Sequence, residues 1–371
     1  MIISFLRTAA FRNLADIAVA TSAKNIFLVG ENGQGKSNFL EALYFCSYAS
    51  SFRGVRDSDL AQNGQKDFSA AITIAEQPAT KNICGEVLVK FVKEKKTILI
   101  DGKRAGDRKD LLSIAPCIVF CHEDMEFVAG SPERRRWFFD QALSLSDPVY
   151  LDDLRRFRWA LKSRNNILRN NTLQRQNNDI ESLLDTLDSQ YVLYGLRLME
   201  KRETAARLFS EIFAALYNEV SGITGMTVLY TPSWKSTGEN ETLSGLLKRR
   251  PADVAAGISL TGPHRDRYTF ALNGTDFTGN ASTGQRRLLA LLLRVAQARR
   301  YSGTTGRNPI LLLDDVLLEM DGEKRRRFLS VLPGYDQAFF TFLPDEPYQR
   351  YRNDDTVVYF VKDGALENAP R

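Results

Sequence analysis

Three features of the sequence predict an α/β fold with a helical insertion. An apolar run, Ile26–Val29, leads into a glycine-rich turn and then into a helix-like segment that includes Phe39. A second apolar run, Ile310–Leu313, ends in two aspartates and is typical of a strand buried on both faces. Between these runs, from about Pro148 to Val220, apolar residues recur every three or four positions, as in amphipathic helices.

The first hundred residues are predicted to be mostly strands, apart from the helix after the glycine-rich turn. The segments Ala70–Ala75 and Glu86–Val92 have strand-like composition, and turn-forming pairs such as Gln77-Pro78 and Asp101-Gly102 interrupt the pattern. This succession predicts an antiparallel meander.

The middle of the chain is predicted to hold two long amphipathic helices. Apolar residues recur at helical spacing from Leu151 to Leu161 and again from Leu183 to Leu198, and the polar stretch Asn170–Asn178 joins the two segments. Neither segment carries heptads long enough for an extended coiled coil, so we expect a compact helical arm.

The last third of the chain returns to strand signals after Ser221. A helix is predicted from about Thr283 to Arg300, followed by the buried strand Ile310–Leu313 and a closing pair of strands. No internal repeat is visible.

Composition indicates an ordinary globular protein of the cytoplasm. The 371 residues are 43% hydrophobic and 26% charged, with a net charge of +5. The longest apolar run, Leu288–Leu293, is far too short to span a membrane, and the N-terminus lacks the apolar stretch of a secretory signal. The cysteines show no paired metal-binding spacing, which favours buried thiols over zinc ligands; they are Cys46, Cys84, Cys117 and Cys121.

The glycine-rich turn has the G-x-x-x-x-G-K-S spacing of a phosphate-binding loop, between a strand and a helix as that motif requires. Glycines let backbone N–H groups turn inward around a polyphosphate, and the helix presents its positive end to the same anion. We expect Lys36 to meet the β- and γ-phosphates and the Ser37 hydroxyl to bind Mg²⁺. The predicted nucleotide-binding residues are Gly30, Glu31, Asn32, Gly33, Gln34, Gly35, Lys36 and Ser37.

The two aspartates after Ile310–Leu313 are predicted to complete this site. Ligands of parallel sheets bind at the carboxyl edge, where both aspartates would lie. Asp314 is expected to be a Mg²⁺ carboxylate. Asp315 would orient or deprotonate the attacking water, which makes Asp315 and Lys36 the candidate catalytic residues.

A third motif, S-T-G-Q at residues 282–285, stands at the predicted start of the helix from Thr283. Helix capping would by itself explain a serine at Ser282. An S-x-G-Q helix start upstream of an Asp-Asp strand also resembles the signature motif of ATP-binding-cassette ATPases. That resemblance implies that Ser282, Gly284 and Gln285 cap the γ-phosphate of an ATP held by a second subunit, so that ATP would join two copies.

Further blocks, in order along nearly the whole chain, resemble the RecF family of bacterial recombination mediators. Two of them, G-S-P-x-x-R-R and G-P-H-R-D, are not general cassette features. The blocks are Ala10–Leu14, Leu40–Ala42, Ser51–Arg53, Phe120–Asp124, Gly130–Asp140, Leu161–Asn166, Gly262–Asp266 and Asp314–Asp321.

The RecF resemblance implies a P-loop ATPase head of the ABC/SMC/Rad50 type with an inserted compact helical arm lobe. Residues 1–120 and 259–371 would form ATPase lobe I, and residues 121–258 lobe II with the arm. It also implies an ATP-dependent homodimer on double-stranded or gapped DNA and weak, DNA-stimulated ATP hydrolysis. Such a protein would assist RecA loading together with RecO and RecR, in DNA repair, replication, recombination and the SOS response.

The resemblance assigns Gly30–Ser37 to the nucleotide loop, Ser282, Gly284 and Gln285 to the signature acting across the dimer, Asp314 to Mg²⁺ and Asp315 to catalysis. Glu319 and Asp321 match a dimer-facing loop. Four positions depart from the family pattern: His122, Ala281, Arg267 and Leu318. All but Arg267 lie in loops expected near the dimer interface, and they bear on how strongly ATP drives dimerisation.

Other functions share some of these motifs. An ATPase subunit of a transporter has all three, but many such subunits carry a histidine on the strand after the acidic pair, where this chain has Gln337–Thr341. A small-molecule kinase or GTPase would leave Ser282–Gln285 without a role. An architectural DNA-binding protein that uses ATP only to dimerise differs mainly in whether Asp315 supports turnover.

Basic residues are concentrated in the middle of the chain, and further clusters lie nearer its C-terminus. Such clusters can neutralise a phosphate backbone, or they can form a solvated, salt-bridged helix face, and charge alone does not separate the two readings. The clusters are Arg134–Arg136, Arg155–Arg158, Lys162–Arg164, Arg169, Lys248–Arg250 and Lys324–Arg327.

Overall fold

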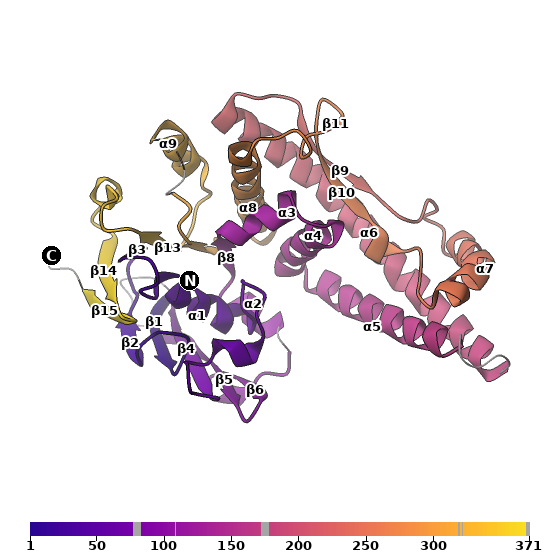
Figure 1. Cartoon of the computed structure of the whole chain (residues 1–371), viewed down its shortest axis with the longest axis horizontal. Coiled ribbons are helices and arrows are strands. Elements are labelled where there is room, and N and C mark those ends of the chain that lie inside the picture. Colours follow the sequence, from indigo (N-terminus) through magenta and orange to yellow (C-terminus); the bar gives the residue numbers. More distant parts are fainter. Residues whose placement is uncertain (77–82, 108, 172–177, 318–319, 321, 369–371) are drawn as a thin grey trace. The chain divides into compact units, whose positions relative to one another are not determined.

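The computed structural model describes residues 1–76, 83–107, 109–171, 178–317, 320 and 322–368 (Figure 1). The chain divides into two compact units, Met1–Asp124 with Ala298–Arg371, and Met125–Gln297. The boundary expected at residue 258 falls inside the second unit, because strand β9 (Met226–Thr231) pairs across it with β10 (Arg267–Leu272).

The first unit contains the predicted antiparallel meander. Its strands follow the order β2-β1-β4-β5-β6-β7, and all adjacent pairs are antiparallel. The strands are β1 (Ile2–Ala9), β2 (Ile17–Ala20), β4 (Phe68–Ala75), β5 (Ile83–Val92), β6 (Lys95–Ile100) and β7 (Lys103–Arg104). The predicted turn at Gln77-Pro78 lies outside the described residues.

The second sheet of this unit holds both predicted buried strands. Its order is β15-β14-β3-β13-β12-β8, parallel except for the terminal hairpin of β14 and β15. The strands are β3 (Asn25–Val29), β8 (Cys117–Phe120), β12 (Ile310–Leu313), β13 (Gln337–Phe342), β14 (Thr356–Lys362) and β15 (Ala365–Asn368). The buried β12 and the closing strand pair are therefore confirmed.

Helix α1 (Lys36–Tyr48) follows β3, and its apolar residues contribute to one core with both sheets. Three of the four cysteines are buried, as expected, but Cys84 is exposed because it lies near the start of β5, where the strand leaves the core. Short helices complete the unit: η1 (Asp57–Leu60), α2 (Lys109–Ile114), η2 (His122–Asp124), α9 (Gly322–Val331) and η4 (Tyr348–Tyr351).

The second unit contains the predicted helical arm. Helices α5 (Pro148–Asn171) and α6 (Asn178–Ser221) pack together around Tyr150, Phe157 and Tyr191, while most of their predicted connection lies outside the described residues. A small antiparallel sheet, β11-β10-β9, contacts α6 through β9. The other elements are α3 (Met125–Val128), α4 (Pro132–Ser146), α7 (Glu239–Ala256), η3 (Pro263–Arg265), β11 (Thr275–Asp276) and α8 (Thr283–Thr305), whose last residues belong to the first unit.

Candidate nucleotide-binding site

The predicted phosphate loop connects β3 to α1 in the first unit. The backbone turns sharply because Gly33 and Gly35 adopt positive φ angles of 78° and 116°, which disfavour other residues. Gly30 begins the loop with its N–H bonded to the Phe342 carbonyl, 3.1 Å away. A side chain at Gly30 would overlap the carbonyl oxygen of Val361, so close backbone packing also requires glycine at that position.

Lys36 lies inside the curve of this loop. Its Nζ donates to the carbonyl oxygens of Gly30, at 2.6 Å, and Glu31, at 3.0 Å, and the residue is 4% exposed. Among the described residues no carboxylate lies within ion-pairing distance of this ammonium. The loop therefore holds a buried positive charge whose partners are neutral carbonyls, an arrangement suited to an anionic ligand.

A polar pocket of about 250 Å³ adjoins the lysine. Its lining brings together five of the predicted nucleotide-binding residues and the predicted catalytic aspartate, whereas Gly30, Glu31 and Gln34 are not part of it. The lining residues are Asn32, Gly33, Gly35, Lys36, Ser37, Asn38, Arg53 and Asp315.

Ser37 and Asp314 meet although they are 277 residues apart in sequence, and the Ser37 hydroxyl donates to Asp314 Oδ1 at 2.6 Å. The pKa of Asp314 is raised to about 6, chiefly because the carboxyl group is buried; the hydrogen bond from Ser37 opposes this rise and the neighbouring Asp315 adds to it. A hydroxyl beside a buried carboxylate is a pair of hard oxygen donors, which fits a Mg²⁺ ion.

Asp315 follows in a left-handed conformation, with φ of 52°, that is rare for residues other than glycine. Thr341 at the end of β13 holds it: the Asp315 N–H lies 2.7 Å from Thr341 Oγ1, which donates to Asp315 Oδ1 at 2.8 Å. Thr341 belongs to the strand where transporter ATPases often carry histidine. Its contact with Asp315 was not predicted, because it depends on the pairing of β12 with β13.

Arg53 lines this pocket, although the sequence assigned it no role. Its Nη1 donates to Asn38 Oδ1 at 2.8 Å and lies 3.4 Å from the buried Glu41 carboxylate, which also pairs with Arg12 at 2.9 Å. In the sequence, the segment Ser51–Arg53 carries only the resemblance to the RecF family. Nothing in its spacing from Lys36 indicates that the guanidinium returns to the phosphate loop.

The predicted signature residues lie at the N-terminus of α8, in the second unit. Ser282 Oγ accepts from the Gln285 N–H at 3.2 Å, and Gln285 Oε1 accepts from the Ser282 N–H at 2.8 Å, which together form a capping box. Capping by Ser282 is thus confirmed. Ser282 and Gly284 are also exposed, so this helix start is open to a ligand. Leu318, Glu319 and Asp321 lie outside the described residues.

The arginines of the G-S-P-x-x-R-R block serve mainly inside the second unit. Arg135 donates to the carbonyls of Val128, at 2.8 Å, and Tyr268, at 3.3 Å, and Arg136 donates to the Asp266 carbonyl at 2.9 Å. Arg134 is exposed. Two of the three arginines therefore brace this unit.

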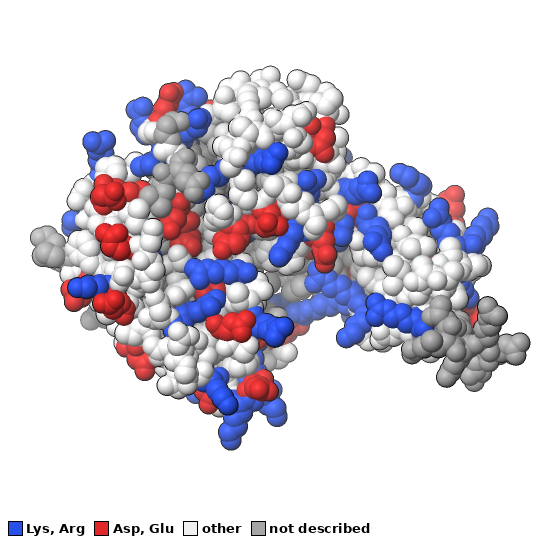
Figure 2. Space-filling model, in the orientation of Figure 1, with Lys and Arg blue, Asp and Glu red and all other residues white. Residues whose placement is uncertain are grey.

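On the face of the molecule drawn in Figure 2, basic side chains do not form one continuous patch. Figure 2 shows blue side chains over α5 and at the turn between β5 and β6, with red ones among them. On α5 the exposed basic residues include Arg156, Arg158 and Lys162. The charge pattern thus leaves both the DNA-binding and the solvated-face interpretation in place.

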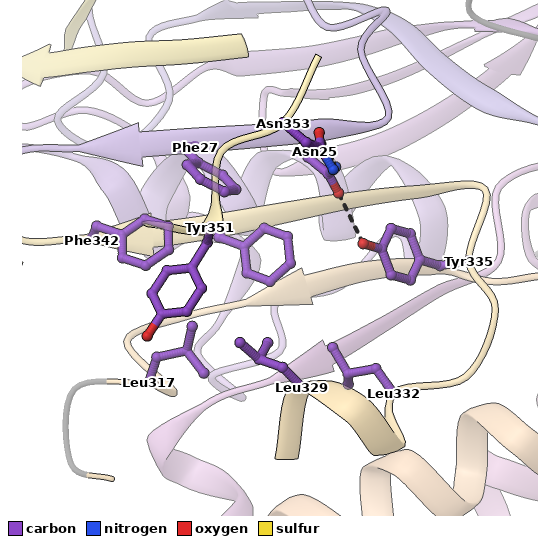
Figure 3. Close-up of a pocket in the computed structure, with 10 residues that line it drawn as sticks. Asn25, Phe27, Leu317, Leu329, Leu332, Tyr335, Phe342, Tyr351 and Asn353 are labelled. Atoms are coloured by element: carbon purple, nitrogen blue, oxygen red, sulfur yellow. Dashed lines mark hydrogen bonds between the residues drawn. The ribbon is translucent and has the colours of Figure 1, made fainter. Parts of the chain in front are cut away.

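A second pocket in the first unit, of about 230 Å³, is chemically different (Figure 3). Phe27, Phe342, Tyr351 and three leucines point into it, and Asn25 Oδ1 at its edge already accepts from the Tyr335 hydroxyl at 2.9 Å. Because none of the described residues that line this pocket is charged, they offer no positive charge to a phosphate group. No described helix combines the length and apolar content needed to cross a membrane.

Comparison with known proteins gives a consistent result along the whole chain. The sequence model of the RecF/RecN/SMC N-terminal domain family matches residues 2–364. The DNA replication and repair protein RecF of Treponema pallidum is 42% identical, with 96% of this chain and 98% of that protein covered. RecF of Lachnoclostridium phytofermentans is 30% identical, with 99% of each chain covered.

Solved structures show the same relationship. A structure described as the recombination mediator protein RecF with ATP in the RecFOR pathway matches with a TM-score of 0.88 and 25% identity, over 99% of this chain and 97% of that one. An Smc head domain from Pyrococcus furiosus matches in fold alone, with a TM-score of 0.54 and 16% identity, over 99% of this chain and 95% of that one. The mixed α/β architecture is thus that of an ABC/SMC-type ATPase head. With a family match over nearly its whole length, the chain belongs to the RecF family of ATP-binding DNA replication and repair proteins.

Proposed function

We propose that this chain is an ATP-driven switch of recombinational DNA repair that dimerises on double-stranded or gapped DNA when it binds ATP. Slow, DNA-stimulated hydrolysis would release the dimer, and the ATP-bound form would assist RecA loading together with RecO- and RecR-type partners. The RecF structure with ATP, placed by its description in the RecFOR pathway, supports the choice of nucleotide and of partners.

The observation that carries the proposal is the assembly of Lys36, Ser37, Asp314 and Asp315 at one end of the parallel sheet. Lys36 and the loop N–H groups would bind the β- and γ-phosphates. Ser37 and Asp314 would hold Mg²⁺, which neutralises phosphate charge when bound. Asp315, held by Thr341, would orient the attacking water or accept a proton from it. Arg53, on the wall of the same pocket, adds a positive charge.

The proposed dimer rests on the α8 N-terminus. A phosphate loop surrounds only one side of a triphosphate, and the exposed N-terminus of another helix supplies N–H donors and a positive dipole end. Ser282, Gly284 and Gln285 of one copy would then meet the γ-phosphate bound by the other. Because ATP would make additional contacts in the dimer, it would bind the dimer more tightly than the monomer and shift the equilibrium toward the dimer, and hydrolysis would reverse that shift.

The molecular mass in solution tests this proposal. We expect monomers without nucleotide and dimers with ATP, Mg²⁺ and duplex DNA, measured by sedimentation or light scattering. The variant Asp315→Asn should bind ATP and prolong the dimer, because hydrolysis is blocked while phosphate binding is kept.

Ser282→Arg should bind ATP as a monomer and fail to dimerise, because the long side chain intrudes at the γ-phosphate. Ser189→Arg, at an exposed position on α6, is the matched control and should dimerise normally. A chain that stays monomeric under every nucleotide and DNA condition would contradict the proposal. Normal dimerisation by Ser282→Arg would contradict the role of the signature.

A further inference from the structure

The C-terminal hairpin of β14 and β15 is bonded directly to the phosphate loop. At its turn, the Gly364 N–H donates to the Gln34 carbonyl at 2.9 Å, and the Asp363 N–H donates to Gln34 Oε1 at 2.6 Å. Both the main chain and the side chain of Gln34 are therefore held by a segment about 330 residues further along the sequence. Gln34 does not line the phosphate pocket, so its contacts serve the loop itself.

A segment near the N-terminus holds the same loop. Asn13 Nδ2 donates to the Gly33 carbonyl at 2.8 Å, and Asn13 Oδ1 accepts from Asn38 Nδ2, on the first turn of α1, at 2.6 Å. The two holding segments are joined to each other, because the Ala15 N–H donates to the Gly364 carbonyl at 3.1 Å. Hydrogen bonds from both ends of the chain thus enclose the loop at Gly33 and Gln34.

The packing at Gly364 has no room for a side chain. A Cβ there would overlap the Asn13 carbonyl oxygen and lie 2.8 Å from the Ala15 nitrogen. On the loop side, a Cβ at Gly35 would already be 3.4 Å from Gly364 Cα. The hairpin turn, the N-terminal segment and the loop are therefore in contact at their backbones.

Another hairpin of the first unit has the same turn without these contacts. Asp101 and Gly102 have φ angles of 50° and 75°, almost identical to the 48° and 77° of Asp363 and Gly364. A Cβ at Gly102 would meet nothing within 4 Å. The turn conformation alone explains glycine at position 102, whereas position 364 must also pack closely against the backbone from Asn13 to Ala15, and Asn13 in turn bonds to the phosphate loop.

We propose that the turn at Asp363-Gly364 positions the phosphate loop for nucleotide, and that Gly364 and Asn13 are positioning residues of the site. This inference rests on the proposed function, since it assumes that the loop binds ATP. Loop residues 31–33 are exposed, and ordering them at the moment of binding would weaken affinity. Hydrogen bonds to the hairpin turn and to Asn13 order the loop before ATP binds, so that most of this loss of affinity is avoided.

The coupling is reciprocal, because any contact that favours ATP binding must itself be favoured by bound ATP. In the wild-type chain, Mg-ATP should slow amide hydrogen exchange in the β14–β15 turn. Exchange at the Asp101-Gly102 turn should not change.

The test compares Gly364→Ala with Gly102→Ala in the full chain. Both variants add one methyl group to a glycine of nearly equal φ. We expect Gly364→Ala to raise the dissociation constant of Mg-ATP by roughly 10-fold or more, measured by titration with a fluorescent ATP derivative. Gly102→Ala should stay within about twofold of wild type. Amide exchange in the peptide spanning residues 30–36 should accelerate in Gly364→Ala alone.

Gln34→Ala provides a milder change if Gly364→Ala does not fold. It removes the acceptor of the Asp363 N–H without adding volume, and we expect a several-fold loss of affinity with faster exchange in the β14–β15 turn. Normal affinity in Gly364→Ala or in a folded Gln34→Ala overturns this inference alone, as does an equal loss in Gly102→Ala. A wild-type chain that binds no ATP overturns the proposed function as well.

Discussion

The first unit has a phosphate pocket around Lys36, and the second unit has a buried ionic cluster of Arg202, Asp140 and Asp266. The buried cations of these two regions have opposite roles. Lys36 is 4% exposed and donates to two neutral carbonyl oxygens. Arg202 is 2% exposed, but its guanidinium lies 2.8 Å from the Asp140 carboxylate and 2.9 Å from that of Asp266. The lysine keeps capacity for an anionic ligand, whereas the arginine is neutralised by the protein itself.

The electrostatics of the second unit follow from this neutralisation. Burial alone would lower the pKa of Arg202, but Asp140 and the other anionic or ionisable groups around it raise that pKa well above its ordinary value. Tyr150 and Tyr230 donate to the same two carboxylates. Because Arg202, Asp140 and Asp266 all have partners within the protein, this cluster has a structural role.

The largest expected effect is on the stability of the second unit. Arg202→Ala should lower its free energy of unfolding by about 3–5 kcal/mol, because two buried carboxylates lose their counter-ion. Trp137, Trp159 and Trp234 all lie in this unit, so tryptophan fluorescence during urea unfolding reports on it.

Arg158→Ala is the matched control for Arg202→Ala. Its guanidinium contacts the same Asp140 at 3.5 Å but is 57% exposed, so we expect a loss below about 1 kcal/mol. Equal losses in the two variants would remove the distinction between the buried cluster and its exposed neighbour.

The next effect is on ligand binding in the first unit. Lys36→Ala should weaken ATP binding by at least about 100-fold, roughly 3 kcal/mol, because the charge that faces the phosphates is lost. Its thermal unfolding without nucleotide should stay close to wild type, and calorimetry can measure both quantities. Lys24→Ala, an exposed lysine just before β3, should bind ATP normally. A severe loss of stability in Lys36→Ala would make its role structural, like that of Arg202.

The smallest effect separates two adjacent arginines of one block. Arg135→Ala should destabilise the second unit by about 1–2 kcal/mol, because two carbonyls lose a charged donor. Arg134→Ala, at an exposed position, should change stability by no more than about 0.5 kcal/mol. DNA binding measured over a series of salt concentrations shows which of the two also contacts phosphate. Similar stability losses would mean that exposure does not decide the role of these arginines.

The sequence by itself determined the features that depend on local pattern. The phosphate loop needs eight consecutive residues with a strand before and a helix after, and β12 needs an apolar run ending in Asp314 and Asp315. Capping by Ser282 needs only a serine directly before an apolar helix. The trans role of the signature and the catalytic role of Asp315 remain predictions, because they concern a second copy and a reaction.

Only the tertiary structure decided which distant groups satisfy one another. Arg53, Thr341 and the turn at Asp363-Gly364 reach the phosphate loop or Asp315 through strand pairing and loop packing, which leave no spacing signal in the sequence. Tertiary packing likewise decides that Arg135 bonds to the Val128 and Tyr268 carbonyls while the adjacent Arg134 is exposed. A buried charge is ligand-binding or structural according to the groups that surround it, and those groups come from segments far apart along the chain.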